Sequence, residues 1–265
     1  MKTNKTIVIV GGVAGGMSFA TRYRRLNQDD KIIVIDKNPY VSFANCGLPY
    51  HISGEIENRQ DLIVVSKETL EKRFLIEVRN EEEVVSIDTV KKKIHTIKDG
   101  EEDELEYDKL ILSPGAKPLE IELNGKESHD AIFTLRNIPE LDKIMGNIKD
   151  KSPKKALVIG GGFIGLEVAE NLKIKGLDVS LVQRSDQVLP PFDKEMAVFA
   201  HNELINNNIN LYLEDSVDKI ENTKVTLKSG KMIEADLIIS SVGISPETEF
   251  LKDSGIELGM KNGIV

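Results

Sequence analysis

The 265-residue chain contains a single cysteine and no tryptophan. One cysteine cannot form an internal disulfide, and a secreted disulfide framework needs several. This cysteine usage indicates a reducing compartment, so we expect a cytoplasmic protein. Cysteine and histidine never occur at metal-ligand spacing, and the hydrolase motif G-x-S-x-G is absent. We therefore expect neither a metal centre nor acyl-transfer chemistry.

Positive charge is scarce as well. Lysine and arginine number 35 against 44 acidic residues, a net charge of -9. No global positive field exists to attract phosphate backbones, so nucleic acid is not an expected partner. The longest nearly uninterrupted apolar run, Ala156 to Leu166, is shorter than the roughly 20 residues that span a bilayer, so no membrane association is expected. A content of 40% hydrophobic and 30% charged residues is typical of a globular protein, and the length suggests two domains.

Two parts of the chain repeat one order of elements. Each begins with a short β-branched strand, a glycine loop, a helix and a second apolar strand, and each continues into a hairpin region and a closing strand. The strands start at 6–10 and 156–159, the loops are GGVAGG and GGGFIG, and the closing segments are 107–118 and 234–246. The pattern predicts an α/β fold with two βαβ units that arose by internal duplication.

Several shorter signals predict local structure. Ser66 is positioned to cap a short helix that reaches Arg73. Asp99-Gly100 and Ser229-Gly230 predict hairpin turns, and we interpret the acidic run EEDELE at 101–106 as a solvated hairpin face. Asn262-Gly263 is a further hairpin signal, but only two residues follow it, so we expect the sequence to stop inside an element.

The second glycine loop has the full G-x-G-x-x-G pattern, formed by Gly160, Gly162 and Gly165 between a strand and a helix. Such a loop allows a tight turn, close approach to a pyrophosphate and close packing of the helix on the strand. Where an acid would bind the ribose 2′-OH, the sequence has Gln183 and Arg184. This pair favours NADPH, or both nucleotides, over strict use of NADH, unless Arg184 is only a solvated loop charge.

The first glycine loop is less regular. Val10 stands where the spacing places the first glycine, and we assign the second and third roles to Gly12 and Gly15. Asp36, at the end of the next strand, supplies the ribose-binding acid. Two dinucleotide sites in one chain indicate hydride transfer through a flavin.

Cys46 lies in an insertion, residues 39–61, that has no counterpart after Gln183. A lone cysteine is often an inert buried side chain, but polar Ser42 and Asn45 flank this one, and Gly47 and Pro49 suggest a following helix whose N-terminus would favour a thiolate. The position of a second thiol in a C-x-x-x-x-C motif is taken by His51, for which we favour a structural role. Redox cycling would therefore use a mixed disulfide or a sulfenic acid.

Ser18, Arg22 and Arg25 share one face of the first helix. The face suits a phosphate-bearing substrate, although spacing alone slightly favours ordinary helix surface charge.

The segments VGGVAGG, SFANCGLPYHISGEI, YDKLILSPGAKP, GGGFIGLEVAENL, DQVLPPFD and SVGISP together resemble the pyridine nucleotide-disulfide oxidoreductases, in their single-cysteine branch of coenzyme A-disulfide reductases and NADH oxidases. The resemblance implies two Rossmann-like domains, each a three-layer arrangement of a parallel sheet and a β-meander, with FAD bound by residues 1–120 plus 245–265 and NADPH or NADH by residues 121–244. It also implies a C-terminal dimerisation domain, absent here, that would make the full-length protein a homodimer. Ser245 departs from the G-x-R-P pattern of similar proteins.

By this resemblance, Cys46 is the redox nucleophile that reduces coenzyme A disulfide or a related small disulfide or persulfide. The alternatives are an oxidase or peroxidase that uses a Cys46 sulfenic acid, and a nucleotide-binding fragment without turnover. The expected substrate-binding residues are Ser18, Arg22, Arg25, Ser42 and Asn45. The expected cofactor-binding residues are Gly11, Gly12, Ala14, Gly15, Asp36, Lys37, Ser113, Pro114, Gly115, Gly160, Gly162, Phe163, Ile164, Gly165, Gln183, Arg184 and Gly243.

Overall fold

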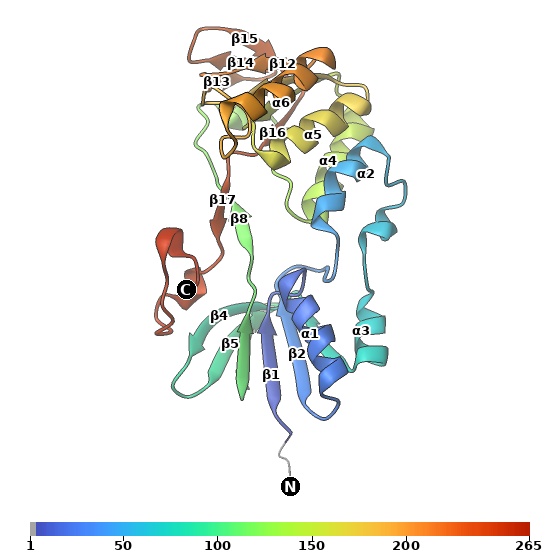
Figure 1. Ribbon diagram of the computed structural model, residues 1–265, viewed down its shortest axis with the longest axis vertical. Helices are drawn as coiled ribbons and strands as arrows, with labels where there is room; N and C mark the ends of the chain where they lie inside the picture. Colours follow the sequence, from blue (N-terminus) through green and yellow to red (C-terminus); the bar gives the residue numbers. More distant parts are fainter. Residues whose placement is uncertain (1–3) are drawn as a thin grey trace. The chain divides into compact units, whose positions relative to one another are not determined.

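The computed structural model describes residues 4–265, which form two compact units (Figure 1). The first unit comprises the chain up to Ala44, Gln60–Lys117 and Ser245–Val265, and the second unit comprises Asn45–Arg59 and Pro118–Ile244. The predicted α/β fold is confirmed. The division differs from the expected boundaries in two respects, because Asn45–Arg59 belongs to the second unit rather than to the first, and because the second unit resumes at Pro118 rather than at residue 121.

The first unit is built on a four-stranded parallel sheet of order β3-β2-β1-β7 and an antiparallel sheet of order β4-β5-β6. Its helices are α1 (Gly15–Leu26) and α3 (Lys67–Phe74). Its strands are β1 (Thr6–Val10), β2 (Lys31–Asp36), β3 (Ile76–Asn80), β4 (Glu83–Asp88), β5 (Lys93–Lys98), β6 (Glu101–Glu106) and β7 (Lys109–Leu112).

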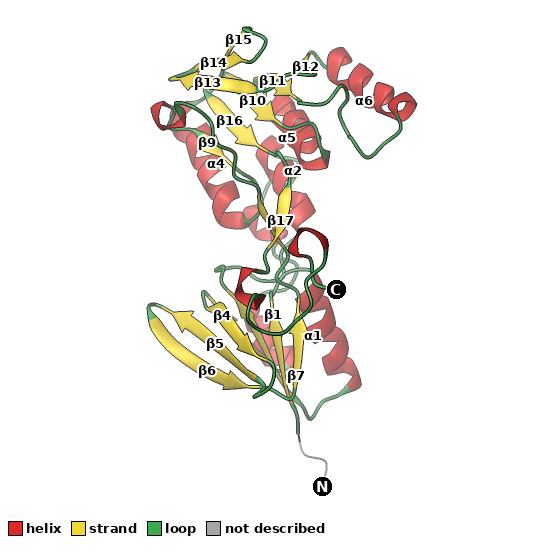
Figure 2. Cartoon of the chain, turned by 90° about the vertical axis from the view of Figure 1, so that its left-hand side faces the viewer, coloured by secondary structure: helices red, strands yellow, loops and turns green. Residues whose placement is uncertain are grey.

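Alternate residues of β1 and β2 bury opposite faces of the first unit's sheet, as the period of two requires. Ile7 and Ile9 pack with Met17 and Ala20 of α1, whereas Val8 packs with the residues of the β4–β6 sheet. Figure 2 shows α1 and the β4–β6 sheet on opposite sides of β1 and β7. The result is the three-layer arrangement that the resemblance implied.

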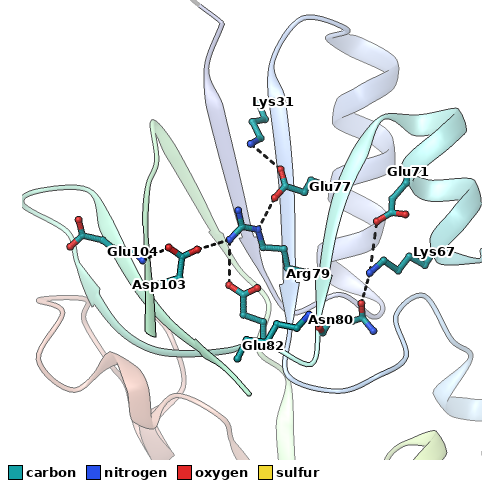
Figure 3. Close-up of polar contacts among 10 residues, drawn as sticks. Lys31, Lys67, Glu71, Glu77, Arg79, Asn80, Glu82, Asp103 and Glu104 are labelled. Carbon is teal, nitrogen blue, oxygen red and sulfur yellow. Dashed lines mark hydrogen bonds and ion pairs between the residues drawn. The ribbon is translucent and has the colours of Figure 1, made fainter. Parts of the chain in front are cut away.

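A network of ion pairs joins the parallel sheet to the β4–β6 sheet (Figure 3). Glu77 lies 2.9 Å from the Lys31 ammonium and accepts a 2.6 Å hydrogen bond from Arg79, which also donates to Asp103 of β6 at 3.0 Å. Five of the six β6 residues are exposed. The interpretation of 101–106 as a solvated hairpin face is therefore confirmed.

The second unit repeats this plan with a five-stranded parallel sheet of order β12-β11-β10-β16-β9 and an antiparallel sheet of order β13-β14-β15. Its helices are α2 (Leu48–Ser53), α4 (Ile138–Lys151), α5 (Phe163–Ile174) and α6 (Lys194–Asn206). Its strands are β9 (Ile132–Phe133), β10 (Lys155–Ile159), β11 (Asp178–Val182), β12 (Asn210–Tyr212), β13 (Val217–Glu221), β14 (Lys224–Leu227), β15 (Met232–Glu234) and β16 (Leu237–Ser240). The short strands β8 (Ala116–Pro118) and β17 (Ile244–Pro246), where the chain passes between the units, pair with each other.

The duplication extends to individual hydrogen bonds. Asp108, before β7, accepts from the backbone N–H of Thr6, and Asp236, before β16, accepts from the backbone N–H of Lys155 at 2.9 Å. Each aspartate thus fixes the start of its closing strand beside the first strand of its unit. A sequence repeat alone would predict the strands but not this shared bond.

The predicted helix cap and the hairpin turns at Asp99-Gly100 and Ser229-Gly230 are also confirmed. Ser66 accepts a hydrogen bond from Thr69 and caps α3, and Asp99-Gly100 joins β5 to β6. Near Asn262-Gly263 the chain returns far enough for Leu258 and Ile264 to form an antiparallel bridge. No helix within residues 4–265 is both long and apolar enough to cross a membrane.

Candidate functional site

A glycine with a positive φ angle directly follows β1 in the first unit and β10 in the second, Gly11 (+96°) and Gly160 (+107°) respectively. A Cβ atom would lie 2.0 Å from the Ser113 carbonyl oxygen at Gly11 and 2.4 Å from the Ser241 carbonyl oxygen at Gly160. Both positions therefore require glycine, for the same conformational and steric reasons.

Five residues further on, the two loops also correspond. A Cβ atom at Gly16 would lie 1.9 Å from the Gly11 carbonyl oxygen, and one at Gly165 would lie 1.9 Å from the Gly160 carbonyl oxygen. The register predicted for the first loop was wrong by one residue, because it was counted from Val10 rather than from the end of β1. The helix-packing role falls on Gly16, while Gly15 lies against the Ser113 hydroxyl.

Asp36, the last residue of β2, and Gln183, which directly follows β11, hold the two loops in the same way. An oxygen of the Asp36 carboxylate accepts from the backbone N–H of Gly12 at 2.8 Å, and the Gln183 side-chain oxygen accepts from the backbone N–H of Gly161 at 2.8 Å. Asp36 is 7% exposed, and its other oxygen accepts from Asn38. A carboxylate and an amide thus occupy the position that faces a ribose in dinucleotide folds.

The side-chain nitrogen of Gln183 is held by the loop that follows β11. Its nitrogen donates to the Ser185 hydroxyl at 2.5 Å, which donates in turn to the Gln187 carbonyl. Arg184 between them is exposed. Among residues 4–265 no ion-pair partner of Arg184 is found, and position 183 carries an amide rather than a carboxylate.

The closing strand of each unit ends beside its glycine loop. The backbone N–H of Ser113 bonds the Val10 carbonyl, and that of Ser241 bonds the Ile159 carbonyl, each at 2.8 Å. The Ser241 hydroxyl is buried and has no hydrogen-bond partner among the described residues. This orphaned donor lies beside Gly165, within the loop that sequence analysis assigned to a pyrophosphate.

The other residues expected to bind cofactors lie at these same edges. Phe163 is exposed at the start of α5, where its ring meets Phe192 edge-on at a centroid distance of 5.9 Å. Lys37 pairs with Glu247 within the first unit. The remaining positions in or beside the loops are Ala14, Pro114, Gly115, Ile164 and Gly243.

Cys46 is exposed, in a single helical turn (Asn45–Gly47) that continues into α2. Leu48, Pro49 and Ile52 are buried and anchor α2 in the second unit, where it packs on α5 and α4. Arg59, at the end of the segment, forms a two-bond ion pair with Asp142 of α4 at 2.6 and 2.7 Å. These contacts explain why the cysteine segment belongs to the second unit.

Two residues near Cys46 in the sequence form hydrogen bonds through their side chains. The Asn45 amide donates to the Arg136 carbonyl at 3.3 Å, and a His51 ring nitrogen donates to the Ile56 carbonyl at 2.7 Å, in keeping with the structural role favoured for His51. Ser42 is 7% exposed in the first unit, where its backbone N–H bonds the Gly12 carbonyl. Ser42 and Cys46 thus fall in different compact units.

The arginines of α1 differ in exposure and in their contacts. Ser18, Arg22 and Arg25 are exposed on α1, whereas Arg24 is 9% exposed and donates to the carbonyls of Phe74 and Leu75. The predicted basic face therefore exists and makes no use of Arg24. In the described part of the chain, no group of three or more His, Cys, Asp or Glu side chains could hold a metal.

Sequence comparison identifies relatives of this architecture. The profile of the family described as "Pyridine nucleotide-disulphide oxidoreductase" matches residues 5–265. A coenzyme A disulfide reductase of Staphylococcus haemolyticus is 38% identical over 259 residues, which are 97% of this chain and 58% of that protein. One from Staphylococcus aureus is 39% identical over 260 residues, with the same coverage.

Solved structures agree with this result. The reduced CoADR-RHD of Bacillus anthracis has a TM-score of 0.95 and 45% identity over 98% of this chain and 47% of its own. An NAD-dependent persulfide reductase from A. fulgidus has a TM-score of 0.92 and 33% identity over 97% of this chain and 49% of its own. The chain thus spans about half the length of these relatives. It belongs to the pyridine nucleotide-disulphide oxidoreductase family.

Proposed function

We propose that this chain carries the nucleotide sites and the redox cysteine of an FAD-dependent NAD(P)H:disulfide oxidoreductase that acts on coenzyme A disulfide or a similar small disulfide. The observation that carries the proposal is the pairing of two dinucleotide-type loops with an exposed cysteine on a helical segment. Relatives named as coenzyme A disulfide reductases support this substrate class.

We assign FAD to the first unit and NADPH or NADH to the second. The first unit fits a flavin dinucleotide because Asp36 is held beside its glycine loop with a carboxylate that can bind a ribose hydroxyl. The second unit fits a nicotinamide dinucleotide because no atom lies within 4 Å of a Cβ built on Gly162, which leaves room for a pyrophosphate, and because the Ser241 hydroxyl lacks a partner. When bound, the flavin supplies transfer of two electrons from the nicotinamide to sulfur.

Cys46 performs the sulfur chemistry. Its thiolate attacks one sulfur of the disulfide, so that one S–S bond forms, the substrate's S–S bond breaks and one thiolate leaves and takes a proton from water. Two electrons and a proton then release the second thiol and restore the Cys46 thiolate. The exposed position of Cys46 allows a disulfide to reach it.

Ser18, Arg22 and Arg25 are the proposed contacts for the phosphates of coenzyme A. They stand on one exposed face of α1 in a protein of net charge -9, which makes this face a local exception. Guanidinium groups bind phosphate in a two-bond geometry. Ser42 and Asn45 remain proposed neighbours of the disulfide.

The proposal is tested by anaerobic turnover of NADPH with coenzyme A disulfide by FAD-loaded protein. We expect the wild-type protein to turn over and Cys46→Ser to lose turnover while it retains its affinity for NADPH. Ser53→Ala, a matched change at the last residue of α2, serves as the control. Turnover that survives Cys46→Ser would contradict the proposal, and peroxide consumption without disulfide reduction would favour the sulfenic acid alternative.

A further inference from the structure

The loop between β11 and α6, residues 183–193, is fastened to the glycine loop of the second unit at Gly161. The Gln183 side chain accepts from the backbone N–H of Gly161, and the backbone N–H of Leu189 donates to the Gly161 carbonyl at 2.7 Å. The Val188 side chain packs so closely that a Cβ atom built on Gly161 would lie 2.8 Å from it. The 183–193 loop therefore holds both backbone polar groups of Gly161 and fixes the conformation of the loop that we assign to a pyrophosphate.

A further hydrogen bond fixes the 183–193 loop to α6. The backbone N–H of Val188 donates to Nε2 of His201 at 3.1 Å. Because Val188 is fully buried, loss of this acceptor would leave a buried N–H group unpaired, which is costly. Leu189, the next residue, has a φ angle of +50°, which a side chain of this kind rarely adopts. The loop at this point therefore depends on its hydrogen bonds rather than on backbone preference.

The bond from Val188 exists in only one protonation state of His201. An imidazole nitrogen accepts a hydrogen bond only when it carries no proton, so the ring must be neutral with its proton on Nδ1. A protonated ring donates from both nitrogens and accepts from neither. Histidine is the side chain whose charge ordinarily changes within the physiological pH range. The bond is therefore present at higher pH and lost on acidification.

The surroundings of His201 offer its ring no other hydrogen bond. Within residues 4–265, the bond from Val188 is the one hydrogen bond of this ring. Asp186, in the same loop, interacts electrostatically with His201, but its carboxylate already pairs with Lys194 at the start of α6. The other titratable groups of α6, of β12, which packs on it, and of the residues that follow β12 are Glu195, Glu203, Tyr212, Glu214 and Asp215.

We propose that His201 is a positioning residue for the nicotinamide dinucleotide. Its neutral ring holds Val188 and thereby the 183–193 loop, which keeps Gly161 in the conformation that binds the pyrophosphate. Protonation of His201 releases the loop, so binding of the dinucleotide weakens on acidification. The inference rests on the proposed assignment of NADPH or NADH to the second unit. It names a residue that sequence analysis did not select, on a helix that contributes nothing to the glycine loop itself.

The first test examines His201 without any ligand. The imidazole nitrogens of the full chain are observed by nitrogen NMR at about pH 8, and the signals lost in His201→Gln identify this ring. We expect a proton on Nδ1 and none on Nε2. A proton on Nε2 at this pH would overturn the proposal, because the ring could not then accept from Val188.

The second test measures binding of NADH to the full chain by titration calorimetry between about pH 8 and about pH 5.5. NADH is the probe because the 2′-phosphate of NADPH would itself titrate in this range. We expect wild type to bind NADH about three- to tenfold more weakly at the acid end, the change that corresponds to loss of one hydrogen bond. An affinity that stays constant over this range would overturn the proposal.

Two variants separate the hydrogen bond from a merely structural role of the ring. His201→Gln keeps an acceptor oxygen in place of Nε2 but removes the titratable group. This variant should bind NADH as wild type does at the upper pH and should keep that affinity in acid. His201→Leu has no acceptor and should bind weakly over the whole range. Equal behaviour of the two variants would overturn the proposal.

His95→Gln is the matched control, because His95 is exposed on β5 of the first unit. It should keep both the affinity and the pH dependence of wild type. If wild type bound no NADH at any pH, the nucleotide assignment would fail, and the role of His201 with it, even with the proton found on Nδ1. If NADH bound with no dependence on His201, the assignment would stand and the inference alone would fail.

Discussion

Asp36 in the first unit and Gln183 in the second hold equivalent loops through the same 2.8 Å bond to a backbone N–H, but only Asp36 carries a charge. The fold needs an acceptor at this position, and a carboxylate or an amide oxygen satisfies that need equally. The charge of the side chain at this position can therefore differ between units that bind different ligands. A negative carboxylate suits a ribose hydroxyl and repels a 2′-phosphate, whereas a neutral amide beside Arg184 tolerates both.

The loops themselves differ at one position. Val13 of the first unit corresponds to Gly162 of the second, between the two glycines that both units require. Open space surrounds Gly162, so its lack of a side chain is not required by packing within the chain. The comparison separates glycines needed by the fold from a glycine whose use is to admit a ligand.

The largest expected effect is at the shared packing glycines. Gly16→Ala and Gly165→Ala each place a methyl group 1.9 Å from a backbone carbonyl oxygen that cannot move without shifting the loop. We expect each to destabilise its unit by at least about 3 kcal/mol, measured by urea unfolding.

Gly146→Ala provides the matched control for those variants. Gly146 is inside α4, and no atom lies within 4 Å of its built Cβ. Alanine there should stabilise the protein by about 0.5–1 kcal/mol. Equal stability of Gly16→Ala and Gly146→Ala would refute the packing requirement at Gly16, and unequal destabilisation by Gly16→Ala and Gly165→Ala would refute the equivalence of the two loops.

The next effect concerns nucleotide choice. Gln183→Glu gives the second unit the charge of the first while keeping the acceptor for Gly161. We expect NADPH to bind at least about tenfold more weakly, because the carboxylate repels the 2′-phosphate, with NADH unaffected or tighter. Titration calorimetry measures both constants.

Two further variants sharpen that result. Arg184→Ala should weaken NADPH by a smaller factor, and Asp36→Asn should leave NADPH affinity unchanged because it acts in the other unit. Equal weakening of NADPH and NADH by Gln183→Glu would mean that position 183 does not face the 2′ position.

The smallest effect is a difference in acid sensitivity. In the first unit, Asp30 fixes the start of β2. The equivalent residue of the second unit is the buried Leu177. The backbone N–H of Lys5, with the Tyr23 hydroxyl, lowers the pKa of Asp30. Because the folded value lies below the unfolded value of about 3.9, the stabilisation is present above that pH and is lost as pH falls through the folded value.

Asp30→Asn should therefore lower the melting temperature at pH 7, and the deficit relative to wild type should shrink as pH approaches 3. Thermal melts across this range measure it. A deficit of constant size at every pH would show that the charge of Asp30 contributes nothing.

Sequence periodicity predicted both βαβ units, both hairpin regions and the cap at Ser66, because these depend on neighbouring residues. It misplaced the first glycine loop by one residue, since several adjacent glycines fit the motif and only the strand end fixes which of them takes which role. Counting from Val10 and Ile159 in parallel would have identified Gly16.

The placement of the cysteine segment was beyond such reasoning. Leu48, Pro49 and Ile52 are apolar in any interpretation, and only long-range packing decides that they bury against α5 and α4. The roles of the individual site residues remain predictions.

The most direct measurement is the visible absorption spectrum of the purified chain, recorded before and after addition of FAD and then after anaerobic NADPH. The account predicts a bound-flavin spectrum that bleaches when NADPH is added, because we propose that the two units hold the two nucleotides of one electron path. A protein that stays colourless after FAD, or a bound flavin that NADPH does not bleach, would contradict it.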